Sequence, residues 1–252
     1  MSRALSMWFR PLSIAVVLWM FPLIGLANEL IVSAASSLTN VMNEAAAQFK
    51  KSHPEARIIL NFASSGTLLR QIERGAPVDV FVSADSETMD VAVRKDLIVD
   101  SAVRIFSKNK LVMLVRTDLN IGDIRSLDNV SIKRIAIGHP RSVPAGRYTQ
   151  KILEKVGVWE RLSDKFIYAQ NVRQCLDYAT RGEVDVAFVY ITDSLLVQNK
   201  LRVMPIEDAS LGIQYPMALV KTSSNTALAE EFVNFLSSQK MDDLLKRNGF
   251  FR

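Results

Sequence analysis

The stretch Leu30-Ile-Val-Ser-Ala-Ala-Ser-Ser-Leu-Thr39 joins a short apolar run to a serine-rich turn, and a helical pattern begins where the turn ends. The stretch Asn61-Phe-Ala-Ser-Ser-Gly-Thr67 has the same arrangement after the β-like run at 57–60. Strand-like runs that alternate with helix-like runs are typical of a largely parallel sheet with helices on both faces. The two stretches therefore predict an α/β fold.

The alternation continues along the chain in two series. The first series has expected strands at 30–32, 57–62 and 78–82, and helices at 39–51 and 65–74. The pattern changes near 106–110, and the second series has expected strands at 111–115, 134–138, 166–169 and 184–190, and helices at 147–156 and 172–180. A strand at 217–220 is expected to return to the first series, and a long helix at 227–247 to close the chain. This predicts two lobes, formed by residues 28–107 with 214–252 and by residues 108–213.

The start of the chain predicts a secretory signal peptide. Arg3 and Arg10 precede an uncharged run at 11–27, which ends in the small residues of Gly25-Leu-Ala27. The run is shorter than the ~20 apolar residues of a membrane-spanning helix and contains two prolines. We therefore expect residues 1–27 to be cleaved near Ala27 and the mature protein to be in the periplasm. An uncleaved membrane anchor is the alternative.

Charge and cysteine content narrow the function classes. The chain carries 31 Lys and Arg against 26 Asp and Glu, a net charge of +5, without a basic block. This pattern indicates a solvated surface, so no nucleic-acid partner is expected. Cys175 is the only cysteine, which excludes an intramolecular disulfide and a cysteine metal site. Its surroundings have a helical pattern and indicate a buried position.

The two serine-rich stretches predict a binding place for an anion. Hydroxyl groups and free backbone N–H groups gather in them where strands give way to helices, and such groups bind anions. Neither stretch contains Lys or Arg, which favours neutral donors, and therefore binding rather than catalysis. The second series offers three candidates at its own strand ends. They are the loop 138–146, the segment Gln170–Arg173 at the start of the next helix, and Val189-Tyr190 at a strand end.

At these residues the sequence resembles the periplasmic molybdate-binding proteins of ABC transporters. The matching segments run in order over nearly the whole mature chain: Ala34–Thr39, Phe62–Thr67, Gly75–Asp79 with Ser83–Asp85, Val143–Gly146, Asn171–Arg173, Gly182–Asp185 with Val189–Tyr190, and Tyr215-Pro216. The resemblance implies a two-lobed periplasmic-binding-protein fold of type II. Each lobe would have a mixed sheet flanked by helices, and the ligand would lie in the interlobe cleft.

The resemblance also implies site residues and partners. Ser37 and Ser65 would supply hydroxyl and N–H donors, Ala145 and Val172 main-chain N–H groups, and Tyr190 its phenol hydroxyl. The ligand would be molybdate or tungstate, held through its oxygens with no direct ligand to the metal, no catalytic residue and no further cofactor. A monomer that delivers the ion to a membrane permease is expected. Rim acids for that contact would be Glu44, Asp85 and Glu87.

Two positions depart from the family pattern, and three alternatives stay open. The family often has Asp where His139 stands and a third hydroxyl where Gly66 stands. A binding protein for another solute, such as sulfate, phosphate or a small organic anion, remains possible, with Arg173 as a partner for a carboxylate. A sensor domain of a regulator is a further alternative. An enzyme is disfavoured because His53 and His139 are the only histidines and no G-x-S-x-G motif occurs.

Overall fold

The computed structural model describes residues 29–197 and 201–252 of the chain. The predicted signal peptide at 1–27 lies outside the described residues. Within these residues, no helix combines the length and the apolar character that crossing a membrane requires.

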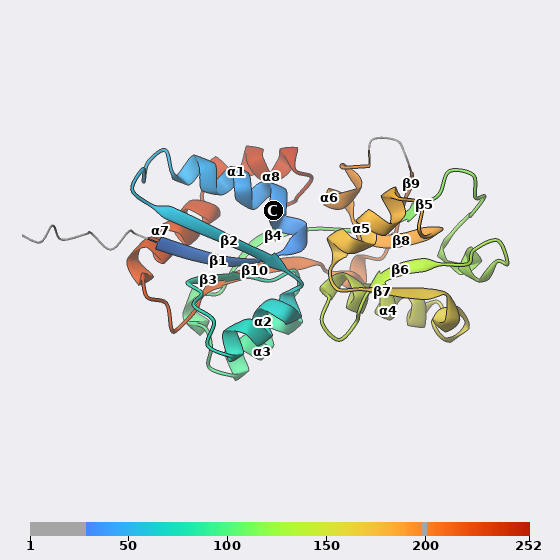
Figure 1. Ribbon diagram of the computed structural model, residues 1–252, viewed down its shortest axis with the longest axis horizontal. Helices are drawn as coiled ribbons and strands as arrows, with labels where there is room; N and C mark the ends of the chain where they lie inside the picture. The colour runs from blue at the N-terminus through green and yellow to red at the C-terminus, as the bar shows by residue number, and fades with distance from the viewer. Residues whose placement is uncertain (1–28, 198–200) are drawn as a thin grey trace, which may run out of the picture.

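Two five-stranded sheets form the two halves of the molecule (Figure 1). We call the half with strand order β2-β1-β3-β10-β4 lobe 1, and the half with strand order β7-β6-β8-β5-β9 lobe 2. The strands of lobe 1 are β1 (Glu29–Ala35), β2 (Arg57–Ala63), β3 (Val80–Val82), β4 (Arg104–Lys108) and β10 (Gln214–Leu219). Those of lobe 2 are β5 (Leu111–Val115), β6 (Ile135–Gly138), β7 (Phe166–Ala169), β8 (Val186–Tyr190) and β9 (Arg202–Pro205).

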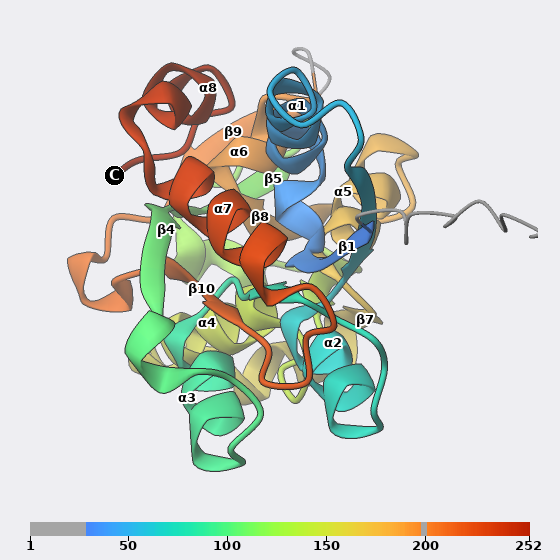
Figure 2. The same ribbon diagram turned by 90° about the vertical axis from the view of Figure 1, so that its left-hand side faces the viewer.

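Helices cover the sheets of both lobes. In lobe 1, α1, α7 and α8 lie on one face of the sheet and α2 and α3 on the other, as Figure 2 shows. The helices of lobe 1 are α1 (Thr39–Phe49), α2 (Ser65–Glu73), α3 (Ser86–Arg94), α7 (Thr226–Ser237) and α8 (Asp242–Arg247). Those of lobe 2 are α4 (Pro144–Lys155), α5 (Val172–Thr180) and α6 (Ile191–Ser194). Short 3-10 turns complete the path: η1 (Ser36–Leu38), η2 (Asp100–Ala102), η3 (Ile124–Asp128), η4 (Glu160–Lys165), η5 (Ala209–Leu211) and η6 (Gln239–Met241).

Both sheets are mixed because one strand in each runs against the others. In lobe 1, β1 is parallel to β2 and β3, whereas β10 is antiparallel to β3 and β4. In lobe 2, β6 is parallel to β7 and β8, whereas β5 is antiparallel to β8 and β9. These antiparallel strands are the ones that the chain enters after crossing between the lobes. The predicted fold class, with a mixed sheet in each lobe, is confirmed.

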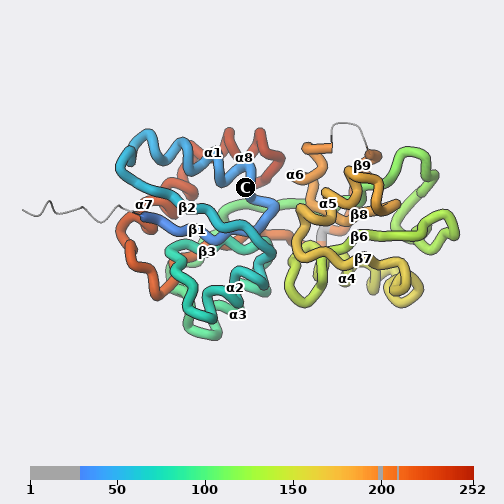
Figure 3. The backbone as a smooth tube through the Cα atoms, in the orientation of Figure 1, coloured from blue at the N-terminus to red at the C-terminus, as the bar shows by residue number. Residues whose placement is uncertain are grey.

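The chain crosses between the lobes through two adjacent segments (Figure 3). Residues 109–110 connect β4 to β5, and residues 206–213 connect β9 to β10. The N–H group of Asn109 in the first crossing donates to the carbonyl of Ile213 in the second, at 3.1 Å. The two lobes are therefore linked by two crossing segments that are joined by a backbone hydrogen bond.

The parallel strands bring the predicted serine turns together. Ala35 at the end of β1 is in register with Ala63 at the end of β2, so the turns that follow both strands lie side by side. In lobe 2, Gly138 at the end of β6 is in register with Ala169 at the end of β7. Because the carboxyl ends of parallel strands meet at one edge of a sheet, each lobe presents several helix starts at one edge.

The expected closing helix at 227–247 is wrong. The helix α7 ends at Ser237, and Ser238 has an extended backbone with φ −78° and ψ 158°. The Ser237 hydroxyl donates to the carbonyl of Val233 at 2.8 Å, and the Ser238 hydroxyl donates to that of Phe235 at 2.6 Å. Hydroxyls that bond nearby carbonyls compete with the helical pattern, and α8 begins only after η6. The strands β4 and β9 were also not expected.

The apolar runs form the core as predicted. Val80–Val82 lies between β1 and β10, and each of its side chains is buried. Cys175 in α5 is fully buried, in agreement with its predicted role as helix packing. This burial raises the pKa of its thiol far above the ordinary range and keeps the group protonated.

Candidate functional site

The five site residues predicted from the sequence line one small cavity between the lobes. Ser37 and Ser65 come from lobe 1, and Ala145, Val172 and Tyr190 come from lobe 2. The cavity volume is about 10 Å³, which is close to the space that one water molecule requires. The lining that the sequence did not predict consists of Ala35, Ser36, Ser64, Ala84, Val143 and Pro144.

Helix starts surround this cavity. Ser65 is the first residue of α2 and Val172 the first of α5. Pro144 begins α4 and has no N–H group, so Ala145 carries the first N–H of that helix. The first N–H groups of a helix have no partner within it, and the helix dipole makes this end positive. Ser37 lies in the 3-10 turn η1. Together these helix starts gather backbone N–H donors around the cavity.

The Ser65 hydroxyl is held as a donor. Its Oγ accepts a hydrogen bond from the N–H of Ala84 at 2.9 Å, and the side chain is fully buried. Because the oxygen already accepts from Ala84, its own proton is free to be donated into the cavity. Ser65 therefore supplies a hydroxyl proton as well as its N–H.

Tyr190 brings a hydroxyl group that the rest of the protein leaves unsatisfied. The residue is 1% exposed, and its Oη has no hydrogen-bond partner in the described part of the chain. Burial raises the pKa of the phenol well above its usual value, so the group stays protonated and is a donor. Its N–H donates to Oδ2 of Asp193 at 3.2 Å. A buried phenol without a partner has a polar group to offer to a ligand.

The cavity has no charged side chain in its lining, as far as the structure describes the chain. The nearby Arg173 is engaged elsewhere. Its Nε lies 2.7 Å from Oδ1 of Asp193, with poor hydrogen-bond geometry, and its Nη2 donates to the carbonyl of Ser37 at 3.3 Å. Asp193 is fully buried, and this burial outweighs Arg173 and raises the pKa of the carboxyl to about 6. Arg173 thus joins the lobes beside the cavity without lining it.

A charged pair joins the two lobes directly. Nη2 of Arg147 in α4 lies 2.6 Å from Oδ2 of Asp85 and donates to the Thr88 hydroxyl at 2.6 Å. The two side chains are 14% and 4% exposed. The expectation of Asp85 as a rim acid for a permease is wrong, because this carboxylate is buried against the opposite lobe.

The two departures from the family pattern lie outside the cavity lining. The Gly66 N–H donates to the carbonyl of Ser142 at 3.0 Å, and an added Cβ would lie 2.8 Å from that oxygen. Gly66 therefore permits a close approach of the two lobes. His139 is exposed, as its loop position predicted.

The candidates for catalysis are engaged away from the cavity. Nε2 of His53 lies 2.7 Å from Oε2 of Glu231 on the outside of lobe 1. Ser237 stands in a Ser-x-x-Lys spacing with Lys240, but its hydroxyl donates to the carbonyl of Val233 in its own helix. Neither residue lines the site.

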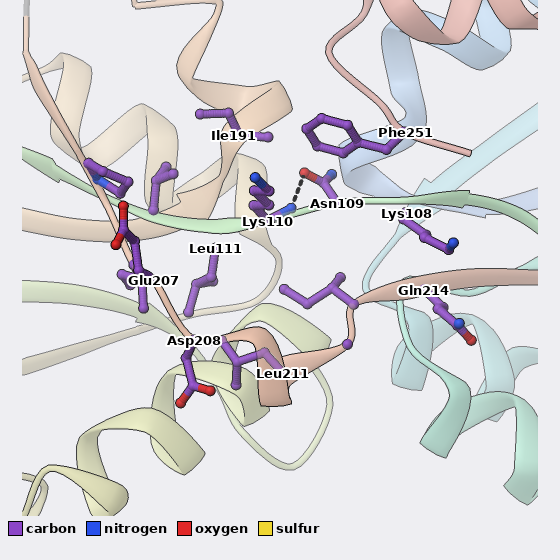
Figure 4. A pocket seen from close by; sticks show the side chains of 15 residues that line it. Lys108, Asn109, Lys110, Leu111, Ile191, Glu207, Asp208, Leu211, Gln214 and Phe251 are labelled. Atoms are coloured by element: carbon purple, nitrogen blue, oxygen red, sulfur yellow. Dashed lines mark hydrogen bonds between the residues drawn. The ribbon is translucent and has the colours of Figure 1, made fainter.

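A much larger cavity of about 920 Å³ lies along the two crossings (Figure 4). Leu111, Ile191, Leu211 and Phe251 contribute apolar walls, with charged side chains such as Lys110 around them. It shares no lining residue with the small cavity. Size alone therefore does not identify the site, because the helix starts and the unpartnered phenol face the smaller space.

Two polar residues behind the site were missed as site residues. Oη of Tyr215 lies 2.9 Å from Oγ of Ser37, and Nδ2 of Asn109 donates to Oη of Tyr215 at 3.1 Å. Tyr215 was quoted only as part of a matching segment. The sequence separation of 178 residues between Tyr215 and Ser37 leaves no local signal for this contact.

Known proteins share both the sequence and the fold of this chain. The molybdate-binding protein ModA of Escherichia coli is 37% identical over 235 residues, which covers 90% of this chain and 91% of that protein. The putative ABC transporter substrate-binding lipoprotein YvgL of Bacillus subtilis is 33% identical and covers 88% of this chain and 85% of that protein. These relatives are named as binding proteins.

Solved structures agree with this relationship. The substrate-binding domain of a putative molybdenum ABC transporter from Clostridium difficile superimposes with a TM-score of 0.67 at 32% identity, over 89% of this chain and 98% of that one. The periplasmic molybdate-binding protein of Azotobacter vinelandii has the same fold, with a TM-score of 0.78 at 23% identity over 88% and 99% of the two chains. The family described as bacterial extracellular solute-binding protein matches residues 30–251. The chain therefore belongs to the bacterial extracellular solute-binding proteins.

Proposed function

We propose that this protein captures molybdate, and its analogue tungstate, in the cavity between the lobes and delivers the ion to the permease of an ABC transporter. The observation that carries the proposal is the set of neutral donors around that cavity. Hydroxyls of Ser37, Ser65 and Tyr190 and the N–H groups of Ala145 and Val172 converge there from both lobes. The names of the 37% and 33% identical relatives support the solute class and the transporter.

The donors favour an anion that carries no proton. Ser65 and Tyr190 each have a proton to donate in this arrangement, because the Ser65 oxygen already accepts from Ala84 and the Tyr190 phenol stays protonated. A protonated oxyanion would direct its own O–H at another donor. Hydrogen bonds to a charged group contribute roughly 1.5–3 kcal/mol each, so one mismatched contact lowers the affinity by about tenfold or more.

The size of the cavity favours a compact inorganic ion. A space of about 10 Å³ holds about one water molecule, so the lobes must separate to admit molybdate, and further still to admit an organic ligand. Among tetrahedral oxyanions, the larger molybdate and tungstate let donors of both lobes make contact at once, whereas sulfate would leave some of these hydrogen bonds stretched. Size is then the property that separates these ions.

The remaining parts of the proposal concern location and partners. The mature protein begins near Asn28, is exported to the periplasm and acts as a monomer without a cofactor. It is a binding protein and not an enzyme, which the names of its relatives support. Mass spectrometry of the protein from the periplasm should give an N-terminus at residue 28.

Calorimetry with ligand-stripped protein tests the proposal. Molybdate and tungstate should bind with similar dissociation constants, in the range of about 1 μM to 1 nM, and should raise the melting temperature by mass action. Sulfate and phosphate at the same concentration should bind at least about 100-fold more weakly. A preference for sulfate, for phosphate or for an organic anion would overturn the proposal.

A further inference from the structure

We infer that Asn109 and Tyr215 are positioning residues that fix the direction of the Ser37 hydroxyl, so that the Ser37 proton is held ready to be donated to the bound anion. The three side chains form a hydrogen-bonded series from the first chain crossing to the cavity. The inference rests on the proposed function, since it assigns a purpose to residues behind the same site.

The series begins at Asn109, whose amide orientation is determined by its neighbours. Oδ1 of Asn109 accepts from the N–H of Lys110 at 2.8 Å, as Figure 4 shows. A carbonyl oxygen is required at that position, because Lys110 N–H is a donor. Nδ2 of Asn109 must therefore point the other way, where it donates to Thr192 Oγ1 at 3.0 Å and to Tyr215 Oη at 3.1 Å. Asn109 is only 6% exposed.

This orientation determines the direction of the Tyr215 hydroxyl. An amide NH₂ group has no acceptor, so Tyr215 Oη accepts from Asn109 and cannot donate to it. The other hydrogen-bond partner of this hydroxyl in the described residues is Oγ of Ser37, at 2.9 Å. Tyr215 is fully buried, and burial raises the pKa of its phenol well above the usual value, so the proton stays on Tyr215. It is donated to Ser37.

The consequence reaches the cavity through Ser37. A serine oxygen that accepts from Tyr215 directs its own proton elsewhere, and Ser37 is 2% exposed and lines the cavity. The Ser65 hydroxyl is also oriented as a donor, because its oxygen accepts a hydrogen bond from the N–H of Ala84. Ser37 and Ser65 are then both oriented as donors, which disfavours any oxyanion that carries a proton.

The inference can be tested with a variant that reverses the direction of the hydrogen bonds between Asn109, Tyr215 and Ser37. In Asn109→Asp, a carboxylate oxygen takes the place of Nδ2 and accepts from Tyr215. Tyr215 must then accept from Ser37, whose proton is turned away from the anion. We expect the molybdate affinity to fall by about 10- to 100-fold. The added negative charge would also weaken binding, so the decisive variant is Asn109→Asp combined with Tyr215→Phe.

The double variant keeps the added charge but frees Ser37. It should bind molybdate at least about fivefold more tightly than Asn109→Asp alone, whereas charge repulsion predicts no recovery. Thr192→Val is the matched control, because it removes the other acceptor of the Asn109 amide and should change the affinity by less than about twofold. A double variant that binds no better than Asn109→Asp overturns the inference.

Tyr215→Phe alone provides an independent measurement if Asn109→Asp does not fold. With no donor behind it, the Ser37 hydroxyl can turn and accept a hydrogen bond from an O–H group of the ligand. The affinity for inorganic phosphate at pH 6, relative to molybdate, should rise by about fivefold, and an unchanged ratio overturns the inference. If the wild type prefers sulfate to molybdate, the proposed function fails, and the same variants are then titrated with sulfate, so the two failures are distinguishable.

Discussion

Arg147 of lobe 2 and Asp85 of lobe 1 form an ion pair across the boundary between the lobes, with 2.6 Å between Nη2 and Oδ2. Asp85 also accepts from the N–H of Thr88 at 3.2 Å and so caps α3. One residue thus belongs both to a helix start in lobe 1 and to a contact with lobe 2. When the lobes separate, the pair breaks and the buried carboxylate of Asp85 becomes exposed.

Replacement of this arginine should weaken anion binding. In Arg147→Met the chain length is kept, but Asp85 stays buried without its cation whenever the lobes are together. Because an uncompensated buried charge is costly, the lobes should separate more readily, and the molybdate affinity should fall by about tenfold. Calorimetry measures this. Lys151→Met, an exposed neighbour on α4 that lies 3.6 Å from Glu87, is the control, and equal losses in both variants would contradict the explanation.

Removal of the Ser65 hydroxyl should weaken binding more strongly. Ser65→Ala removes a donor to the anion and leaves the N–H of Ala84 without its acceptor. We expect a loss of about 1.5–3 kcal/mol in the free energy of molybdate binding. Ser101→Ala, at an exposed position in η2, should leave the affinity unchanged. A double variant Ser37→Ala with Ser65→Ala that binds like wild type would remove these serines from the site.

The Tyr190 hydroxyl should affect stability and binding in opposite directions. Tyr190→Phe removes a buried polar group that has no partner among the described residues. The ligand-free variant should therefore be more stable than wild type, by about 1 kcal/mol, in urea unfolding. Its molybdate affinity should fall by about tenfold or more. A less stable variant with unchanged affinity would show that the phenol has a structural role only.

The buried carboxyl of Asp193 should make stability depend on pH. Its pKa is raised from 3.8 to about 6, mainly by burial. A carboxyl with a raised pKa in the folded state stabilises the fold fully below its unfolded pKa, and this contribution is lost as the pH rises through the folded pKa. The wild type should therefore lose stability relative to Asp193→Asn between about pH 4 and pH 6. Urea unfolding of both proteins at several pH values measures the difference, and a constant difference would contradict the assignment.

The sequence predicted the parts of the site that depend on local pattern. Ser65 and Val172 could be identified because a strand-like run precedes each and a helical pattern follows. Parallel pairing then brings such turns together, as the register of Ala35 with Ala63 shows. The pattern also indicated the strand end at Tyr190 and the loop that contains Ala145, and the resemblance assigned these two residues their roles. The structure brings them to the same cavity.

The contacts that support the site could not be predicted in the same way. Arg147 and Asp85 are 62 residues apart, and Tyr215 and Ser37 are 178 residues apart. The first pair depends on how the two lobes meet, and the second on how distant segments pack within lobe 1. Neither charge pattern nor periodicity encodes these arrangements. The end of α7 at Ser237 was missed because serine is compatible with a helix until its hydroxyl finds a nearby carbonyl.

The burial of Cys175 in α5 has a practical consequence for measurements on this protein. A protonated thiol without solvent access reacts slowly with maleimides and oxidants, and it is the only cysteine in the chain. A new cysteine can therefore be placed on each lobe, for example at the exposed positions 44 and 168, and labelled with a fluorophore pair while the native residue remains. Energy transfer between the two dyes would then report lobe motion during each titration.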